Sequence, residues 1–519
     1  MPVSDATTRF DVLVVGAGSA GCVLAARLSE DPGLRVALVE AGGPATDPDI
    51  LIPQKWPFLA GRSYDWCYRT TPQHGTADRV HEWPRGRLIG GSSCLHAMAH
   101  VRGSIEDFES WGALTGSARW RYAGLLPAFR RLERFSGGES EQHGVSGPLD
   151  VRLPEAEISP LVRSYWAAGR QIGIPWLGDH NGGRLCGLAP NSLTLRAGRR
   201  LSAAAAYLDP VRARPGLTVL TQTLAHRLAV SRERICGIEA EVGGEPRLIS
   251  ARMTILCAGA LGTPLLLMRS GIGPATQLEQ ARVSCRADHP EVGENLHDHL
   301  LTAGNVYRAR RPVPDSQLQH SESLTYLHSE DPSRTTGTPD IVLGCVTLPV
   351  VSERFERPAA GSAFTILSGV THPTSRGRLS LTGPGIGDPP SIDPAYLSTA
   401  HDRTLARQAL EWARSVGGQT ALSEWRAEEL YPGPDCRSPG DLDAFIARAV
   451  ITHHHPVGTC RMGSDARSVV TPELALRGFQ DCYIVDASVI PSIPSGPVHA
   501  AVLAIAETFA ADLAPSRLS

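Results

Sequence analysis

Three consecutive histidines, His453–His455, are the residues of this sequence best suited to acid–base chemistry. An imidazole has an ordinary pKa of about 6.5, so it can accept or donate a proton near neutral pH. Adjacent side chains of an extended strand point to opposite faces, which puts His453 and His455 together and turns His454 away as a packed structural histidine. Histidines also bind metals, but no cluster with ligand spacing stands nearby in the sequence, so we expect no metal.

A glycine-rich turn near the start of the chain is typical of dinucleotide binding. An apolar run ends in G-A-G-S-A-G at residues 16–21, a helix-like stretch follows, and a second apolar run ends on Glu40. In such a βαβ unit Gly16 allows the tight turn, Gly18 lets the backbone approach the pyrophosphate, and Gly21 lets helix and strand pack closely. Glu40 is placed to bind the ribose hydroxyls.

Two later segments favour FAD over NAD, which the glycine turn alone does not distinguish. Arg252–Leu256 and Tyr483–Val485 are predicted strands, followed by C-A-G-A and D-A-S. Both are expected to end at the same sheet edge as the first strand, where doubly wound folds bind ligands. A cofactor contacted by the beginning, the middle and the end of the chain is long and buried. This favours FAD over a dissociable nicotinamide.

The composition is that of a globular enzyme and excludes several other classes. The 519 residues suit two or three interleaved domains, and a net charge of -3 leaves no basic face for nucleic acid. Lys55 is the only lysine, which excludes a Walker A loop and leaves little room for a pyridoxal phosphate Schiff base. The 11 cysteines are scattered and are expected to be reduced. The first residues lack a signal-peptide pattern, so we expect a cytoplasmic protein without a membrane partner.

A second domain is indicated by alternating apolar residues around 341–349 and 363–370, which predict antiparallel strands. The predicted fold class is α/β, with a Rossmann-like FAD-binding domain and an interleaved antiparallel-sheet domain that covers the substrate. We expect the FAD-binding domain to comprise residues 1–155, 196–300 and 441–519, and the substrate domain residues 156–195 and 301–440.

Four segments resemble the signatures of the glucose-methanol-choline (GMC) oxidoreductases. They are R-G-R-L-I-G-G-S-S-C-L-H-A-M-A-H-V-R-G at 85–103, G-A-L-G-T-P-L-L-L-M-R-S-G-I-G at 259–273, V-G-E-N-L-H-D-H at 292–299 and H-P-V-G-T-C-R-M-G at 455–463. The resemblance extends over nearly the whole chain. It implies an FAD enzyme that moves a hydride from an alcohol carbon to flavin N5 while a base removes the hydroxyl proton.

The resemblance also assigns roles to individual residues. It makes His455 the base. The second catalytic position, a histidine or asparagine in most members, is here Pro497, which has no side-chain donor, so His453 is the expected replacement. His499 is a weaker candidate and is equally compatible with a core histidine. Some members link a histidine covalently to the flavin, but the corresponding residue here is Leu95, so we expect non-covalent FAD.

The small-residue turn at 90–93 can approach the flavin or its diphosphate with its backbone N–H groups, although a purely structural turn is the alternative. His96 stands where many members have asparagine, and its role stays open. The residues expected to bind the cofactor are Gly16, Gly18, Ser19, Ala20, Gly21, Glu40, Ala41, Arg87, Gly90, Gly91, Ser92, His96, Ala97, Met98, Ala225, Ala258, Gly259, Asp486, Ala487, Pro497 and Val498.

The combination of G-G-S-S-C-L-H-A-M, H-H-H-P and S-G-P-V-H-A resembles GMC members that oxidise pyridoxine to pyridoxal with oxygen as acceptor. A small primary alcohol and O2 are therefore the expected partners. Other aromatic, furanic or amino-sugar alcohols, and an acceptor other than oxygen, stay open. The same fold hosts hydroxynitrile lyases with a redox-silent flavin, and a non-enzymatic flavin protein is the least favoured alternative.

Overall fold

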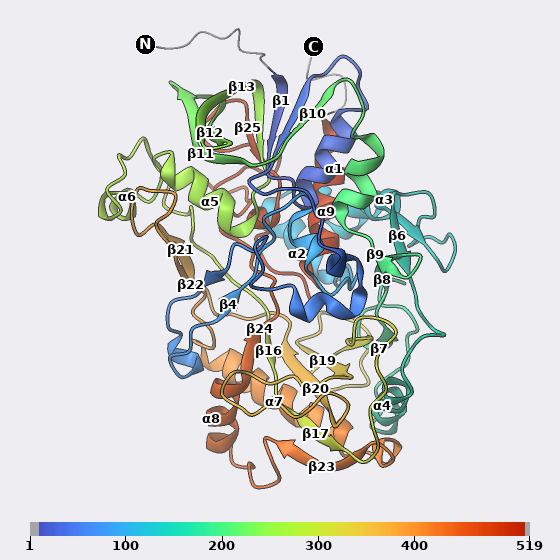
Figure 1. Cartoon of the computed structure of the whole chain (residues 1–519). Coiled ribbons are helices and arrows are strands. Elements are labelled where there is room, and N and C mark those ends of the chain that lie inside the picture. The colour runs from blue at the N-terminus through green and yellow to red at the C-terminus, as the bar shows by residue number, and fades with distance from the viewer. Residues whose placement is uncertain (1–9, 514–519) are drawn as a thin grey trace.

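Two β-sheets organise the structure, a computed structural model that describes residues 10–513 (Figure 1). One sheet, at the top of Figure 1, has the strand order β10-β2-β1-β13-β12-β11, with β25 also paired to β13. The other, at the bottom, has the order β18-β19-β20-β16-β24, with β17 paired to β20 and β23 paired to β17. The predicted α/β fold with a second, antiparallel sheet is therefore confirmed.

Within residues 10–513 the α-helices are α1 (Ser19–Leu28), α2 (Ile105–Thr115), α3 (Tyr122–Leu132), α4 (Pro160–Gln171), α5 (Gly259–Arg269), α6 (Ala275–Gln280), α7 (Ala400–Gly417), α8 (Pro439–Ala449) and α9 (Val498–Asp512). The first sheet contains β1 (Phe10–Val15), β2 (Val36–Val39), β10 (Leu217–Leu220), β11 (Thr223–Ser231), β12 (Arg234–Val242), β13 (Glu245–Leu256) and β25 (Cys482–Ile484). The second contains β16 (Leu300–Thr302), β17 (Val306–Ala309), β18 (Ser323–Leu327), β19 (Ile341–Val346), β20 (Ala363–Val370), β23 (Arg426–Tyr431) and β24 (Val450–Thr452).

The parallel part of the first sheet carries the expected nucleotide-binding topology. β10, β2, β1, β13 and β25 run in one direction. The cores of β1 and β2, V-L-V-V and V-A-L-V, are buried throughout, as is typical of parallel strands covered on both faces. Because β1, β13 and β25 are adjacent and parallel, their carboxyl ends meet at one sheet edge. The prediction that three distant segments return to this edge is confirmed.

The pairing of β16 with β24 in the second sheet brings two distant histidine segments together. β16 follows directly on His299, and β24 ends directly before His453. The two strands are antiparallel, with Leu300 opposite Thr452, and the His453 N–H donates to the His299 carbonyl at 2.9 Å. β24 thus belongs to the second sheet, although it lies beyond the domain boundary expected at residue 440.

The first and last helices of the described chain pack against each other (Figure 1). α9 also contacts α3. Its Glu507, with a side chain only 1% exposed, binds Arg27 of α1 at 2.8 Å and Arg131 of α3 at 2.9 Å. The Tyr207 hydroxyl donates to the same carboxylate at 3.0 Å. Since a buried carboxylate needs such partners, Glu507 fixes the order of these helices around the first sheet.

The 11 cysteines all lie within the described range and are free thiols, seven of them buried. Buried thiols of this kind pack as small apolar side chains. Between residues 10 and 513, no helix has both the length and the apolar character needed to cross a membrane.

Candidate active site

Asp298 holds the main chain of the predicted base. Its Oδ1 accepts the His455 N–H at 2.6 Å, and its Oδ2 accepts the hydroxyls of Thr452 at 2.6 Å and Tyr396 at 2.5 Å. Tyr396 in turn accepts the indole N–H of Trp83 at 3.1 Å. The carboxylate is 2% exposed, and burial raises its pKa. With three donors on one buried carboxylate, the backbone at His455 has little freedom to move.

His299 contacts the ring of His455. The two Nδ1 atoms are 3.0 Å apart, and His299 Nε2 donates to the carbonyl of Thr371 at 2.8 Å. The rings meet edge to face, with centroids 5.3 Å apart. His299 and Asp298 both lie in V-G-E-N-L-H-D-H, a segment that the sequence analysis noted as a family landmark without assigning these roles. The motif therefore marked this segment, but it did not show that Asp298 and His299 contact His455.

His453 completes the histidine cluster, for a reason that differs from the sequence argument. Its ring centroid lies 4.4 Å from that of His455 and 6.2 Å from that of His299. However, β24 ends at Thr452, and His454 has a φ of 66°, so these residues do not form the extended strand that was expected. The left-handed conformation at His454 turns its two neighbours to the same side.

The sequence-based view that no further cluster lies near His453–His455 is wrong, because His299 arrives from a distant segment. One nitrogen from each of His299, His453 and His455 lies within 4.8 Å of the others, a spacing that a metal ion could also use. Two of these rings are instead hydrogen-bonded to each other. His453 contacts the other two only through its ring, without a nitrogen-to-nitrogen hydrogen bond to either.

Burial keeps these rings neutral. It lowers the pKa of His299 and of His453 to about 3, and it lowers that of His455 well below its ordinary value, with further contributions from His453, His299, His454 and the Arg85 guanidinium. A histidine must be neutral to accept a proton. The rings of the cluster are therefore in the protonation state that can accept a proton near neutral pH.

The C-terminal segment 493–497 is tied to the same motif. His297 Nε2 accepts the Ile493 N–H at 3.0 Å, and its Nδ1 donates to the Asn295 carbonyl at 2.6 Å. Pro497 is buried and precedes the first residue of α9, with φ −55° and ψ 134°. Val292–His299 thus positions both the His455 segment and the Pro497 segment.

The glycine fingerprint and the first signature meet at the sheet edge. At Gly91, an added Cβ would lie 2.7 Å from the Cα of Gly18, so the two turns are in backbone contact. The Gly90 N–H donates to the Ala17 carbonyl at 2.8 Å. An added Cβ at Gly18 meets nothing within 4 Å, and α1 begins there without a side-chain cap. A free helix N-terminus bordering open space fits a diphosphate.

Glu40 lies at the end of β2 beside this turn. Its Oε2 accepts the Ala17 N–H at 3.0 Å, and its Oε1 accepts the Gly42 N–H at 2.9 Å. Each oxygen keeps a lone pair for a ribose hydroxyl. The Thr223 N–H donates to the Glu40 carbonyl, which brings the start of β11, and with it Ala225, to the same place.

Asp486 joins the two later segments of the sheet edge. Its Oδ2 accepts the Gly259 N–H at 2.9 Å and the Thr263 hydroxyl at 2.6 Å, and its Oδ1 accepts the N–H of Ser488 at 2.8 Å. The carboxylate predicted to bind the cofactor is thus already satisfied within the protein. Its observed contribution is to hold the start of α5 against segment 486–488.

Two unpaired histidines mark the predicted flavin site. The rings of His96 and His499 lie 4.6 Å apart, and both residues are half-buried. His96 Nδ1 accepts the Met98 N–H at 2.8 Å, but His96 Nε2 and both nitrogens of His499 find no partner among the described residues. Buried polar atoms without partners fit a polar ligand such as a flavin ring. Leu95 packs nearby in an apolar cluster with Ile50, Leu59, Leu88 and Cys94.

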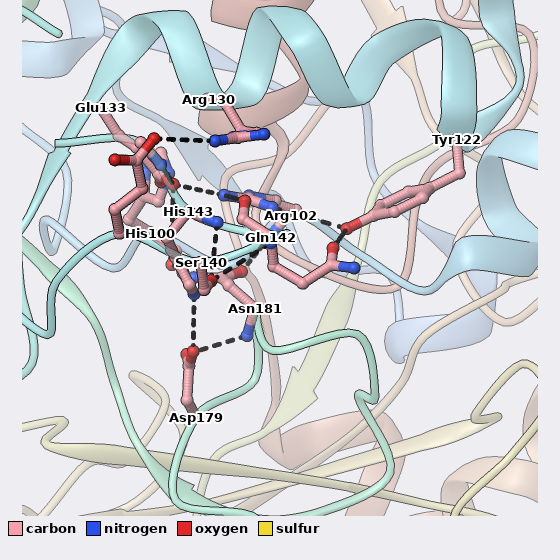
Figure 2. A network of polar contacts seen from close by, with 12 residues as sticks. His100, Arg102, Tyr122, Arg130, Glu133, Ser140, Gln142, His143, Asp179 and Asn181 are labelled. Atoms are coloured by element: carbon pink, nitrogen blue, oxygen red, sulfur yellow. Dashed lines mark hydrogen bonds and ion pairs between the residues drawn. The ribbon is translucent and has the colours of Figure 1, made fainter. Parts of the chain in front are cut away.

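A buried charged network continues from the first signature (Figure 2). The Arg102 guanidinium donates to Glu133 Oε1 at 2.5 Å, and the same oxygen lies 2.9 Å from His143 Nδ1. His143 Nε2 lies 2.8 Å from Asp179. The His143 pKa is raised: burial lowers it, but its two carboxylate partners raise it by more. Sequence reasoning did not identify this network.

Comparisons with known proteins identify close relatives. The chain matches the family profile of the GMC oxidoreductases over residues 10–301 and 373–506. It is 50% identical over 502 residues to pyridoxine 4-oxidase from Microbacterium luteolum, covering 96% of this chain and 99% of the relative. It is 36% identical over 542 residues to the mitochondrial choline dehydrogenase of Mus musculus, covering 97% and 89%. The crystal structure of pyridoxine 4-oxidase from Mesorbium loti matches with a TM-score of 0.96 and 51% identity, covering 97% and 99%.

Proposed function

The chain belongs to the GMC oxidoreductase family, and from this premise we propose that it is an FAD-dependent alcohol oxidase that converts pyridoxine to pyridoxal. Two relatives of about half identity over nearly the full length, both pyridoxine 4-oxidases, support the substrate. The combination H-H-H-P with a proline at position 497 supports it as well.

The observation that carries the reaction type is the half-buried, neutral His455, whose main chain is held by Asp298. His455 accepts the hydroxyl proton of the alcohol while the carbon loses a hydride. FAD, when bound by these residues, would supply the acceptor for the hydride and the means of reducing O2 to hydrogen peroxide. His453, 4.4 Å from His455 between ring centroids, supplies the second hydrogen bond to the alcohol oxygen that Pro497 lacks.

The residues that hold FAD lie along the sheet edge. The N-terminus of α1 takes the diphosphate, Glu40 takes the ribose hydroxyls, and the turn at 90–93 approaches the flavin. His96 and His499 have free buried nitrogens for the ring's polar edge. Leu95 has no nucleophilic atom, so attachment is non-covalent, and acid precipitation should release all the flavin into the supernatant. Flavin retained in the pellet would contradict this assignment.

The test of function is anaerobic mixing of the holoenzyme with pyridoxine and, separately, with benzyl alcohol. Pyridoxine should bleach the flavin's visible absorption, and admitted oxygen should restore it with one peroxide formed per turnover. A site built for polar ring substituents should prefer pyridoxine over benzyl alcohol by about tenfold or more, because benzyl alcohol leaves those groups unpaired. Equal turnover of both would reject the pyridoxine assignment but keep the oxidase, and bleaching by neither alcohol would reject the oxidase.

A further inference from the structure

We propose that His299 is a positioning residue that fixes the tautomer of His455 and so makes Nε2 the basic nitrogen. This inference rests on the proposed function, since it assigns the atom that takes the alcohol proton. The inference goes beyond the proposed function by naming a residue, far from His455 in sequence, that decides whether the base can act.

The carbonyl oxygen of Thr371 determines the tautomer of His299. His299 Nε2 lies 2.8 Å from the carbonyl oxygen of Thr371, which can only accept a hydrogen bond. His299 Nε2 therefore carries its proton. In the neutral ring the other nitrogen, Nδ1, then has a lone pair and no hydrogen.

The second step transfers this constraint to the base. His299 Nδ1 lies 3.0 Å from His455 Nδ1, so one of these two nitrogens must donate to the other. Because His299 Nδ1 has no hydrogen, His455 Nδ1 is the donor. His455 Nε2 is then left with its lone pair. Burial, which lowers the pKa of His299 to about 3, keeps this arrangement neutral at ordinary pH.

The position of the His299 ring is set by strand register. His299 directly precedes β16, and the main-chain bond from His453 N–H to the His299 carbonyl fixes it beside β24. His455 is fixed independently through Asp298 Oδ1. Both partners of the ring-to-ring hydrogen bond are therefore held at the backbone, which lowers the entropy cost of aligning them.

The proton and the electrons balance in this scheme. The alcohol O–H bond breaks and its proton joins His455 Nε2, while the C–H bond breaks and its hydride goes to the cofactor. His455 becomes an imidazolium, and its Nδ1–H continues to donate to neutral His299. Aldehyde formation thus releases one hydride and one proton, which together convert O2 to hydrogen peroxide.

A neutral partner has a consequence that a carboxylate partner would not have. An anion beside an imidazole raises its pKa, whereas the neutral His299 does not. Among residues 10–513, the carboxylate found in contact with His455 is that of Asp298, and it binds the His455 main-chain N–H. The other titratable or charged groups around the pair, from every segment packed against it, are His453, His454, Arg85, His297, His372 and Asp107.

The proposal is tested with three variants of the holoenzyme. His299→Asn keeps an acceptor oxygen near the Nδ1 position, His299→Leu removes the acceptor, and His299→Asp makes it negative. The rate of anaerobic flavin reduction by pyridoxine is measured against pH. Surface His401→Leu serves as the control for a histidine lost elsewhere, and FAD content with thermal melting reports on folding.

We expect His299→Leu to slow flavin reduction roughly a hundredfold with little change in the half-saturating pyridoxine concentration, because the wrong tautomer is populated. His299→Asn should stay within about tenfold of the parent, and His299→Asp should raise the apparent pKa of the rate by about one unit or more. An unchanged rate in His299→Leu, or no pKa difference between the Asn and Asp variants, would overturn the assignment. Should the Leu variant fail to fold, the Asn and Asp pair still decides. A parent enzyme that pyridoxine and other alcohols cannot reduce would reject the proposed function instead.

Discussion

The histidine rings at the start of β16 and the end of β24 differ from a surface histidine in their solvation. His299 is buried and His453 and His455 are half-buried, and their pKa values fall because the charged form loses its hydration. The same burial makes each unmatched nitrogen costly, so the hydrogen bonds between the rings matter for both structure and chemistry. His453 Nδ1, for which the described residues offer no partner, is available to a bound alcohol or flavin.

Removal of the base is the direct residue-scale prediction. His455→Ala should slow flavin reduction by roughly a hundredfold to ten-thousandfold, the usual contribution of a general base, with FAD still bound. His453→Gln should weaken pyridoxine binding and lower the rate while keeping the pH dependence, since the base remains. Stopped-flow reduction at several alcohol concentrations separates the two effects. Loss of the pH dependence in the His453 variant and its retention in the His455 variant would reverse the roles.

The pH dependence has a defined sign. His455 acts in its neutral form, so the rate should rise with pH through its apparent pKa and then level off. Because burial lowers that pKa well below about 6.5, the plateau should begin on the acid side of this value. A profile that is still rising above neutrality would show that the bound complex restores hydration or negative charge to the ring.

The sequence identified individual residues where the signal is local, and missed them where it is not. The three consecutive histidines and Pro497 can be identified from the sequence alone. The partners of His455 are not, because His299 lies 156 positions away and Asp298 lies 157 positions away. Only the register of β16 against β24 decides that these residues meet. The expectation that His453–His455 form an extended strand was wrong, since β24 ends at Thr452 and His454 has a left-handed conformation.

At the scale of elements, the βαβ unit was predictable because its parts are contiguous. The apolar run before the glycine turn forms β1, and the predicted return of two later strands holds. Glu40 sits at the end of β2, where its Oε2 contacts the glycine turn at Ala17 and its Oε1 contacts the Gly42 N–H. The surroundings of Glu40 also shift its pKa, and the sequence motif does not reveal this shift.

Glu40 should make FAD binding depend on pH. Burial raises its pKa to about 7, although the N–H groups of Gly42 and Ala17 oppose the shift. A carboxylate accepts ribose hydroxyls better when ionised, so FAD affinity for the apoprotein should increase as pH rises through about 7. Because the pKa of Glu40 is higher in the folded protein than the ordinary value of 4.5, the unfolded chain releases this proton first as pH rises. The apoprotein itself should therefore lose stability as pH rises from 4.5 toward about 7.

Fluorescence titration of apoprotein with FAD between mildly acidic and mildly alkaline pH measures this effect. Glu40→Gln should weaken binding by about 1–3 kcal/mol at alkaline pH and abolish the pH dependence. Exposed Glu245→Gln on β13 is the matched control and should behave as the parent. A pH-independent affinity in the parent would mean that Glu40 does not contact the cofactor.

At the scale of the whole molecule, the buried network of Figure 2 joins segments that lie apart in the chain. Arg102 comes from the first signature, Glu133 directly follows α3, and Asp179 lies in the loop after α4. His143 lies between two carboxylates and has its pKa raised. Such a network was not predictable, because the sequence does not show which charged residues are buried or which partners they contact.

His143 should therefore make global stability depend on pH. A folded-state pKa above the unfolded value of about 6.5 contributes stability that is complete below that value and is lost as pH rises through the folded pKa. The melting temperature of the holoenzyme should fall across this window. His143→Gln should lower the melting temperature and flatten its pH dependence, whereas His74→Gln, at a fully exposed histidine, should do neither. Parallel curves for the parent and His143→Gln would contradict the assignment.

The contact between α1 and α9 constrains when the protein can mature. Glu507 of α9 meets Arg27 of α1 across 480 positions of the chain, so this ion pair forms only after α9 has left the ribosome. Until then the apolar surface of α1 that α9 covers is without this cover. A nucleotide-binding domain built from one contiguous segment can form its whole site early in translation. Here Pro497, at the start of α9, belongs to the proposed FAD site, so that site is complete only after α9 has been synthesised.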